Sequence, residues 1–268
     1  MSIDINEIEK AEGLARQCTQ AIARILEPGM SEADAASLMR EWLKTQGVQS
    51  HLHRPLAWFG PRTMLSGRSG WLPRPGIQPD YFPSTRTLSK GMAYALYCAP
   101  RLKHAVAESL HCDHLGPNPD YAYLVSLLEQ LQQDLCQAIG SGHTLAQLEA
   151  GLHGFASRHS LQLRHKRLPI AHWIRPYDRQ PDTGYANQRL VDKLASMTGN
   201  PMPAHLPSSG VPLKADTPLQ DGLWVVQPWL TSARAGAGFR SLLKVEDGSA
   251  VWLNPPVSAA DMALSYSA

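Results

Sequence analysis

The sequence predicts an α+β fold made of two related halves, each with paired helices packed on a curved antiparallel sheet. At an offset of 113 residues the chain matches itself in five places: Gly29 and Gly142, Ser31 and Thr144, Met39 and Leu152, Trp42 and Phe155, Val48 and Leu161. A later echo relates residues 88–94 to residues 219–225. Because the echoes keep their order, we interpret them as one repeated unit; the alternative is convergence of two ordinary helix–turn–helix passages.

Composition is that of an ordinary globular protein and argues against several partners. Of 268 residues, 43% are hydrophobic and the net charge is +2, which suits a packed core. No run of lysine and arginine is present to follow a phosphate backbone, so nucleic acid is not expected as a partner. The longest apolar stretch, residues 92–100, is too short to cross a bilayer, and the acidic amino-terminal segment does not resemble a signal peptide. Scattered cysteines indicate a reduced, cytoplasmic chain: Cys18, Cys98, Cys112 and Cys136.

The first half predicts two helices followed by strands. Apolar residues at helical spacing predict a helix over 5–26, which Pro28 and Gly29 end. Ser31 and Asp34 form a capping pair at the start of a second helix, which Gly47 stops. Strands are predicted around 56–59, over 91–98 and over 103–110.

The second half repeats this plan. Pro119 begins a predicted helix that runs to about Ile139, and Thr144 with Gln147 forms a capping box before the next helix. Alternating and apolar segments predict four further strands, over 162–166, 168–174, 222–230 and 238–245. We therefore expect a single domain over 1–268, with repeat halves at about 8–110 and 119–250 and an insertion at about 178–212.

Four short motifs carry a resemblance to a known family. They are Glu-Pro-Gly-Met-Ser-Glu-Ala-Asp at 27–34, Leu-Ser-Lys-Gly-Met at 88–92, Leu-Gln-Asp-Gly-Leu-Trp-Val-Val-Gln-Pro at 219–228, and Lys-Val-Glu-Asp-Gly at 244–248. In this order they resemble the methionine aminopeptidase, aminopeptidase P and creatinase family, whose pita-bread fold has two pseudo-symmetric halves. The resemblance extends over roughly residues 8–250.

The resemblance implies a pair of metal ions held by two Asp, one His and two Glu, which activate a water molecule. The family's ligand positions fall in turn on Tyr97, Glu108, His172, Gln227 and the pair Ser241–Leu242. Only Glu108 and His172 keep ligand chemistry, and a phenol and an amide do not balance two divalent cations. We therefore expect a degenerate site with no metal and no other cofactor.

The retained groups suggest proton-transfer chemistry. His172 lies in an apolar segment and is the candidate general base; the alternative is a core histidine. Glu108 is its candidate acid–base partner, and the alternative is a surface charge on a helix that begins near Lys103. Tyr97 and Gln227 complete the candidate catalytic set, with the Gln227 amide placed to orient a substrate carbonyl or a water.

Three further residues are candidates for substrate binding. Arg240 matches the family's arginine before the last ligand and is expected to hold a substrate carboxylate. His205 resembles the family's second histidine near the substrate, and Arg62 lies where the family has a substrate loop of the first half. For each, the alternative is an ordinary structural or surface side chain.

These residues leave three functions open. The first is a metal-independent hydrolase or lyase that acts on a small amino-acid-like or amide substrate. The second is a catalytically inactive pita-bread protein that binds a peptide or a protein. The third is a metal-dependent Xaa-Pro or methionine aminopeptidase whose ligands include Asp113 or Glu246 after a register shift. A homodimer is compatible with all three.

A separate metal hypothesis rests on the segment 111–114, which is His-Cys-Asp-His. Strand alternation would place His111 and Asp113 on one face. Structural zinc sites usually need two separated ligand pairs, and the sequence shows no second pair. The segment is therefore a weaker candidate than the family's ligand positions.

Overall fold

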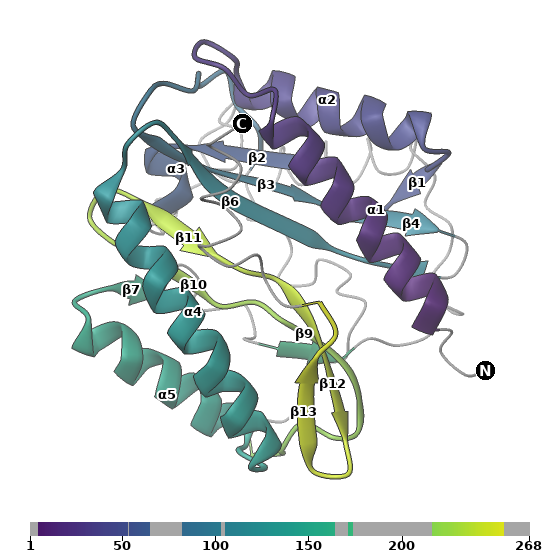
Figure 1. Ribbon diagram of the computed structural model, residues 1–268, viewed down its shortest axis with the longest axis vertical. Helices are drawn as coiled ribbons and strands as arrows, with labels where there is room; N and C mark the ends of the chain where they lie inside the picture. The colour runs from purple at the N-terminus through teal and green to yellow at the C-terminus, as the bar shows by residue number, and fades with distance from the viewer. Residues whose placement is uncertain are drawn as a thin grey trace, which may run out of the picture.

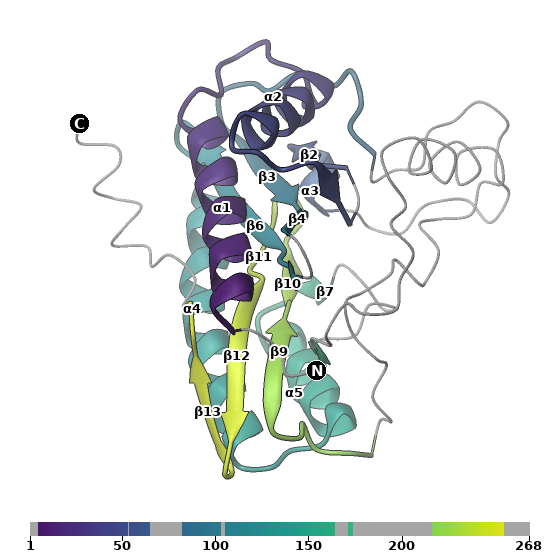
Figure 2. The same ribbon diagram turned by 90° about the vertical axis from the view of Figure 1, so that its right-hand side faces the viewer.

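The computed structural model describes residues 5–52, 54–64, 82–102, 105–163, 171–173 and 216–254. In Figure 2, α1 and α4 run along the same side of the strands. Within the described residues, no helix has the length and apolar character needed to cross a membrane. The helices are α1 (Ile5–Ala23), α2 (Glu32–Thr45), α3 (Pro61–Met64), α4 (Pro119–Gly140) and α5 (Leu145–Arg158).

The first half forms two antiparallel sheets beneath α1 and α2 (Figure 1). One sheet has the order β2-β3-β6 and the other β1-β4-β5. In the first sheet Tyr97 stands opposite Leu56 on one side and Leu110 on the other. The strands are β1 (Ser50–His51), β2 (Leu56–Phe59), β3 (Met92–Cys98), β4 (Pro100–Leu102), β5 (Ala105–Val106) and β6 (Ser109–Leu115).

The second half again pairs two helices with two antiparallel sheets. Their orders are β13-β12-β9-β8 and β11-β10-β7. The helix α4 packs on β11 and β13, and α5 packs on β7. The strands are β7 (Gln162–Leu163), β8 (Ala171–Trp173), β9 (Gly222–Val226), β10 (Trp229–Thr231), β11 (Gly236–Gly238), β12 (Ser241–Glu246) and β13 (Ser249–Trp252).

The repeat seen in the sequence is present in the backbone. Ser31 and Thr144 each cap a helix with a complete capping box. Each also forms an isolated antiparallel bridge, to Thr87 and to Pro218 respectively. Thr87 and Pro218 directly precede the repeated segments 88–94 and 219–225. In both halves, therefore, this segment begins beside the start of the second helix. Equivalent local sequences therefore make equivalent long-range contacts.

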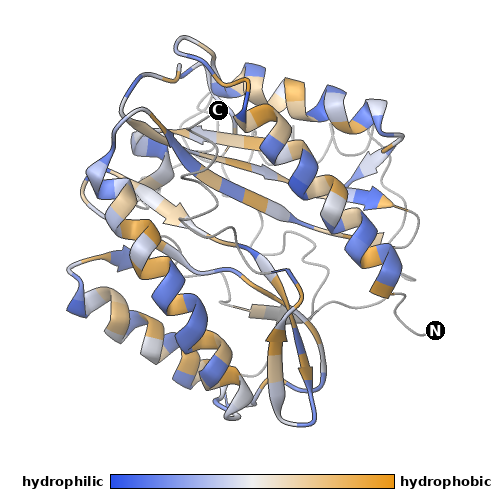
Figure 3. Cartoon of the chain, in the orientation of Figure 1, coloured by the Kyte–Doolittle hydropathy of each residue, from blue (hydrophilic) through white to orange (hydrophobic). Residues whose placement is uncertain are grey.

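Apolar stripes hold each helix pair on its strands. Along α1 and α4, apolar and polar residues form separate stripes (Figure 3). In the first half the stripe of α1 and α2 packs on β2 and β3, and in the second half α4 and α5 pack on β9 to β12. The largest of the completely buried side chains is Trp224 of β9. Burial of such apolar area is the main stabilising contribution in either half.

Several predicted strands are shorter or interrupted. The segment 222–230 breaks at Gln227 and Pro228, because proline cannot donate to a ladder, and the chain passes from one sheet to the other. The segment 238–245 likewise breaks at Phe239 and Arg240. The segment 103–110 is divided between β5 and β6. The insertion at about 178–212 lies outside the described residues.

A tight contact between backbones joins the two halves. The α3 residue Thr63 accepts one hydrogen bond at its Oγ1 from the Gly236 N–H, 2.9 Å away. Its carbonyl oxygen accepts another from the indole N–H of Trp229, 3.0 Å away. The Thr63 hydroxyl in turn donates to the carbonyl of Gly60 at 2.7 Å. One buried threonine thus connects the first half to β10 and β11 of the second.

Candidate functional site

Three of the predicted site residues meet in one buried cluster. The hydroxyl of Tyr97 donates to Oε2 of Glu108. The Nη2 of Arg240 forms an ion pair with the same oxygen, and its guanidinium carbon lies 5.2 Å from the centre of the Tyr97 ring. The side chain of Glu108 is 3% exposed and that of Arg240 is 13% exposed. We call Tyr97, Glu108 and Arg240 the acidic cluster.

Strand ends bring the acidic cluster together from both halves. Tyr97 lies on β3, and Glu108 lies between β5 and β6, two strands that hold its backbone on either side. Arg240 lies in the break between β11 and β12. In a regular strand, successive side chains alternate between the two faces of the sheet, and a break in the strand changes this direction. The break at Arg240 therefore lets its side chain reach the first half.

Burial fixes the protonation of the phenol in this cluster. Loss of solvent raises the pKa of Tyr97 well above its usual range; the nearby charge of Arg240 opposes this shift and Glu108 adds to it. Tyr97 is therefore a neutral hydrogen-bond donor, not a source of negative charge. The surface-helix alternative for Glu108 is wrong, because this residue is buried next to strands.

Aromatic side chains from both halves surround the cluster. Trp58 is stacked near Tyr97 with ring centres 6.3 Å apart, and it meets Trp229 edge-on at 6.2 Å. All three rings belong to one buried apolar group with Leu56 and Val106. Trp58 and Trp229 therefore pack on the Tyr97 side of the acidic cluster.

The strand register relates another predicted position, His172, to the strand that follows Arg240. His172 of β8 stands opposite Val225 of β9, which stands opposite Leu242 of β12. His172 and Leu242 therefore share one row across three strands, and Leu242 follows Arg240 by two residues. The backbone of His172 thus belongs to the same sheet as the strand that follows Arg240.

A model of metallopeptidase family M24 matches residues 6–198 of the chain. The chain belongs to this family. Its pita-bread fold accounts for the two repeated halves, so the fold predicted from the sequence is confirmed. A comparison with curated proteins finds no match.

Solved M24-like structures share this fold at low sequence identity. X-Pro aminopeptidase from Thermotoga maritima aligns with a TM-score of 0.68 and 13% identity over 95% of this chain and 62% of that one. Prolidase from Pyrococcus furiosus gives a TM-score of 0.66 and 13% identity over 94% of this chain and 64% of that one. This chain thus spans about three fifths of their length.

Methionine aminopeptidase from Thermotoga maritima is more similar in length. It aligns with a TM-score of 0.62 and 11% identity over 95% of this chain and 98% of that one. At such identities the likeness establishes the fold and leaves the chemistry to be read from the side chains.

The M24 ligand positions of this chain do not fit a pair of metal ions. Their one carboxylate, Glu108, is already bonded to a guanidinium and a phenol. Tyr97 remains protonated, Gln227 is neutral and Leu242 has no donor atom. The other two residues at these positions, His172 and Ser241, supply no carboxylate. Within the described residues, no group of three or more His, Cys, Asp or Glu side chains is arranged to hold a metal. Two divalent cations require several carboxylate oxygens, so we derive no step through a metal.

The alternative carboxylates also lie away from the acidic cluster. Asp113 stands opposite Tyr94 in the β3–β6 ladder and accepts a hydrogen bond from its hydroxyl at 3.4 Å. This is the other face of β6 from Leu110, which stands opposite Tyr97. Glu246 lies at the far end of β12 and pairs with Lys244 at 2.6 Å. A register shift that recruits either residue is therefore not observed.

The remaining predicted residues stand as follows. Gln227 is half-buried in the turn between β9 and β10. His205 lies outside the described residues, and only the backbone of His172 is described. Arg62 forms an ion pair with Glu32 at 2.9 Å, and its Nη2 donates to the carbonyl of Phe82. Its role in substrate binding stays a prediction.

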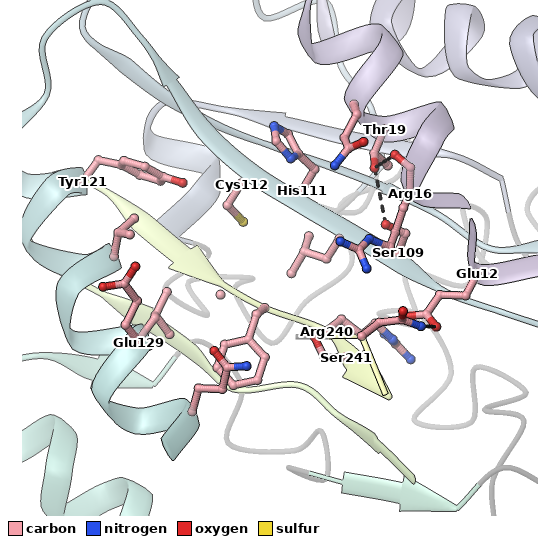
Figure 4. A pocket seen from close by; sticks show the side chains of 18 residues that line it. Glu12, Arg16, Thr19, Ser109, His111, Cys112, Tyr121, Glu129, Arg240 and Ser241 are labelled. Atoms are coloured by element: carbon pink, nitrogen blue, oxygen red, sulfur yellow. Dashed lines mark hydrogen bonds between the residues drawn. The ribbon is translucent and has the colours of Figure 1, made fainter. Parts of the chain in front are cut away.

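A polar cavity at the seam between the halves, which Arg240 of the acidic cluster also lines, was not anticipated from the sequence. It is a cavity of about 90 Å³ between α1 and α4, above β6 and the β11–β12 break (Figure 4). Arg16 and Thr19 of α1 face it, and Ser109 and His111 line its floor. Burial lowers the pKa of His111, although the charge of Asp113 opposes this shift. The lowered pKa keeps the imidazole neutral.

The most unusual group of this cavity is Glu12, which is 3% exposed. Its Oε2 accepts a hydrogen bond from Nδ2 of Asn254, which follows β13. Burial raises the pKa of Glu12 to about 7, with Asn254 and Arg16 opposing the shift and Glu9 adding to it. No local sequence signal distinguishes this glutamate from an exposed helical one, because its burial depends on the second half of the chain.

We expect Glu12→Gln to flatten the pH dependence of folding stability. The folded chain holds the Glu12 proton more tightly than the unfolded chain. The stability that protonated Glu12 contributes to the fold is therefore complete below the unfolded pKa of 4.5 and is lost as the pH rises through about 7. Between about pH 5 and about pH 8, wild type should lose about 2–3 kcal/mol more unfolding free energy than the variant.

Urea unfolding at several pH values measures this difference. Glu9→Gln is the matched control, because Glu9 is exposed one helical turn away. Its pH dependence should stay close to that of wild type, because Glu9 makes the smallest contribution to the raised pKa of Glu12. Equal pH dependence of wild type and Glu12→Gln would show that the carboxyl group of Glu12 is solvated in the folded chain.

Proposed function

We propose that this chain binds a short peptide or an amino-acid-like ligand without a dinuclear metal centre. One observation carries the proposal. The single carboxylate left at the M24 ligand positions, Glu108, is bonded inside the protein to Arg240 and Tyr97. A site whose only acidic ligand is committed in this way lacks the means to hold the family's metal ions.

The ligand class follows from the relatives and from the surrounding side chains. The solved relatives include an X-Pro aminopeptidase and a methionine aminopeptidase, and these names refer to peptides. Trp58, Tyr97 and Trp229 give this position buried apolar surroundings. Gln227 offers amide hydrogen bonds to a peptide backbone.

Metal analysis and ligand titration test this proposal together. Protein purified without added metal should carry manganese, cobalt or zinc far below one ion per chain. Xaa-Pro dipeptides should raise its melting temperature equally with and without a chelator, and the dipeptides should remain intact by mass spectrometry. A near-stoichiometric metal, or dipeptide hydrolysis that a chelator abolishes, would overturn the proposal and restore the aminopeptidase hypothesis.

A metal-independent hydrolase or lyase is the second candidate. The strand register supports it. His172 and Leu242 stand in one row across the sheet, and Leu242 follows Arg240 by two residues. In this mechanism His172 would move a proton at the substrate, and Glu108 would have to leave its ion pair to assist. Turnover of amide substrates that persists in chelator and is lost in His172→Ala would favour this candidate over simple binding.

A further inference from the structure

We infer that Arg240 is a tethered counter-ion, which gives Glu108 the positive charge that metal ions would otherwise supply at this M24 position. The inference rests on the proposed function, since it assumes a site without metal. It assigns Arg240 as a positioning residue that pairs with the buried carboxyl group of Glu108. It also differs from the sequence prediction, in which Arg240 holds a substrate carboxylate.

The geometry of the acidic cluster requires such a charge. Glu108 is almost fully buried, and the transfer of an isolated carboxylate into a protein interior is strongly unfavourable. Tyr97 offers a hydrogen bond to this carboxylate but no charge. The guanidinium of Arg240 offers both, through its ion pair with the same oxygen.

The chemistry of a guanidinium suits this position. It is permanently charged, planar and weakly hydrated, so it enters an aromatic environment more readily than an ammonium or a hydrated metal ion. The guanidinium carbon of Arg240 lies 5.2 Å from the Tyr97 ring centre, a cation–π distance. The aromatic neighbours Trp58 and Trp229 pack around that ring. A carboxylate, a phenol and aromatic walls together form a receptor for one guanidinium group.

The receptor also connects the two halves of the chain. Glu108 and Tyr97 belong to the first half, and Arg240 precedes β12 of the second. A metal pair in this fold would join ligands from both halves, and the ion pair here does the same. The loss of Arg240 should therefore loosen the contact between the halves as well as leave a buried negative charge.

Chemical rescue of Arg240→Ala tests the inference. This variant deletes the guanidinium and leaves the Glu108 receptor in place. We expect its melting temperature to fall by roughly 8–15 °C. Guanidinium chloride at roughly 100 mM should then raise the melting temperature of Arg240→Ala by roughly 3–6 °C relative to the same concentration of potassium chloride. Wild type should show no rise, because its receptor is filled.

A double variant is the matched control. Arg240→Ala combined with Glu108→Gln has the same vacancy but no buried negative charge. It should be more stable than Arg240→Ala alone and should gain nothing from guanidinium. If Arg240→Ala does not fold, Arg240→Lys replaces it: a retained charge should recover part of the stability, and Arg240→Met should recover none.

The outcomes separate this inference from the proposed function. Stoichiometric metal in wild type overturns both. A metal-free wild type, with an Arg240→Ala variant that is as stable as wild type or is not rescued, overturns the counter-ion role and leaves the binding function standing. Rescue of the single variant alone, in a metal-free protein, supports the counter-ion role.

Discussion

Replacing Glu32 by alanine should destabilise the fold by about 3–5 kcal/mol, although Glu32 touches none of the acidic cluster. Glu32 opens α2 and is completely buried. Its Oε1 accepts a hydrogen bond from the Phe59 N–H at 2.8 Å and pairs with Nε of Arg62 at 2.9 Å. Its Oε2 accepts from the N–H and the hydroxyl of Ser84, at 2.9 and 2.6 Å.

The size of this effect comes from the groups left behind. Alanine at position 32 would remove the carboxylate partner of Arg62, whose side chain is only 17% exposed, and the acceptor of the buried N–H of Phe59. A buried donor or charge that loses its partner has no water to replace it, so the full desolvation penalty lowers the free energy of unfolding. Because Phe59 ends β2 and Arg62 lies in α3, the loss should spread to both elements.

Urea unfolding of Glu32→Ala and Glu41→Ala measures the difference between a buried and an exposed glutamate. Glu41 lies on the same helix, and its side chain is 57% exposed beside Arg40 and Lys44. Its removal should change the unfolding free energy by less than about 1 kcal/mol. A loss of less than about 1 kcal/mol for Glu32→Ala as well would mean that Arg62 finds another partner.

Local signals explain why much of the fold was predictable. The capping residues Ser31 and Thr144 and the apolar stripes of the helices are short-range patterns, and each appears where the sequence places it. The repeat extends these local signals to the architecture, since two equal helix pairs require two equal sets of strands. Strand ends were less predictable, because Gln227–Pro228 and Phe239–Arg240 change sheets within apolar segments.

The acidic cluster was predictable only in part. Counting along the family motifs selects Tyr97, Glu108 and Arg240, but it does not predict that Arg240 pairs with Glu108. That ion pair joins residues from different sheets, and neither local sequence contains a sign of the other. Glu32 shows the same limit, since an acidic residue in the first turn of a helix is usually a solvated one that favours the helix dipole.

Gly236→Ala should be as damaging as the loss of Glu32, for a steric reason. A Cβ atom built on Gly236 would lie 2.1 Å from the carbonyl oxygen of Thr63 and 2.9 Å from Nε1 of Trp229. Relief by movement is restricted, because the Gly236 N–H and the Trp229 indole both donate to Thr63. Overpacking and the loss of these two hydrogen bonds together predict a loss of about 3–5 kcal/mol.

Gly151→Ala is the matched control for this variant. Gly151 is exposed in α5, and a Cβ atom there would meet nothing within 4 Å. Alanine should therefore stabilise the helix by about 0.5–1 kcal/mol. If urea unfolding shows a loss of unfolding free energy for Gly236→Ala and a gain for Gly151→Ala, the effect lies in the contact between the halves. An unchanged unfolding free energy for Gly236→Ala would show instead that α3 moves away without cost.

Thr63→Val connects this contact to the acidic cluster. It removes the hydroxyl that accepts from Gly236 but keeps the carbonyl that accepts from Trp229. We expect a loss of about 1–2 kcal/mol, smaller than for Gly236→Ala, because no atom is forced into the backbone. Trp229 also stands edge-on to Trp58 beside Tyr97. The seam that fixes the position of Trp229 therefore shapes the walls around Glu108, so the integrity of the site depends on how the halves are joined.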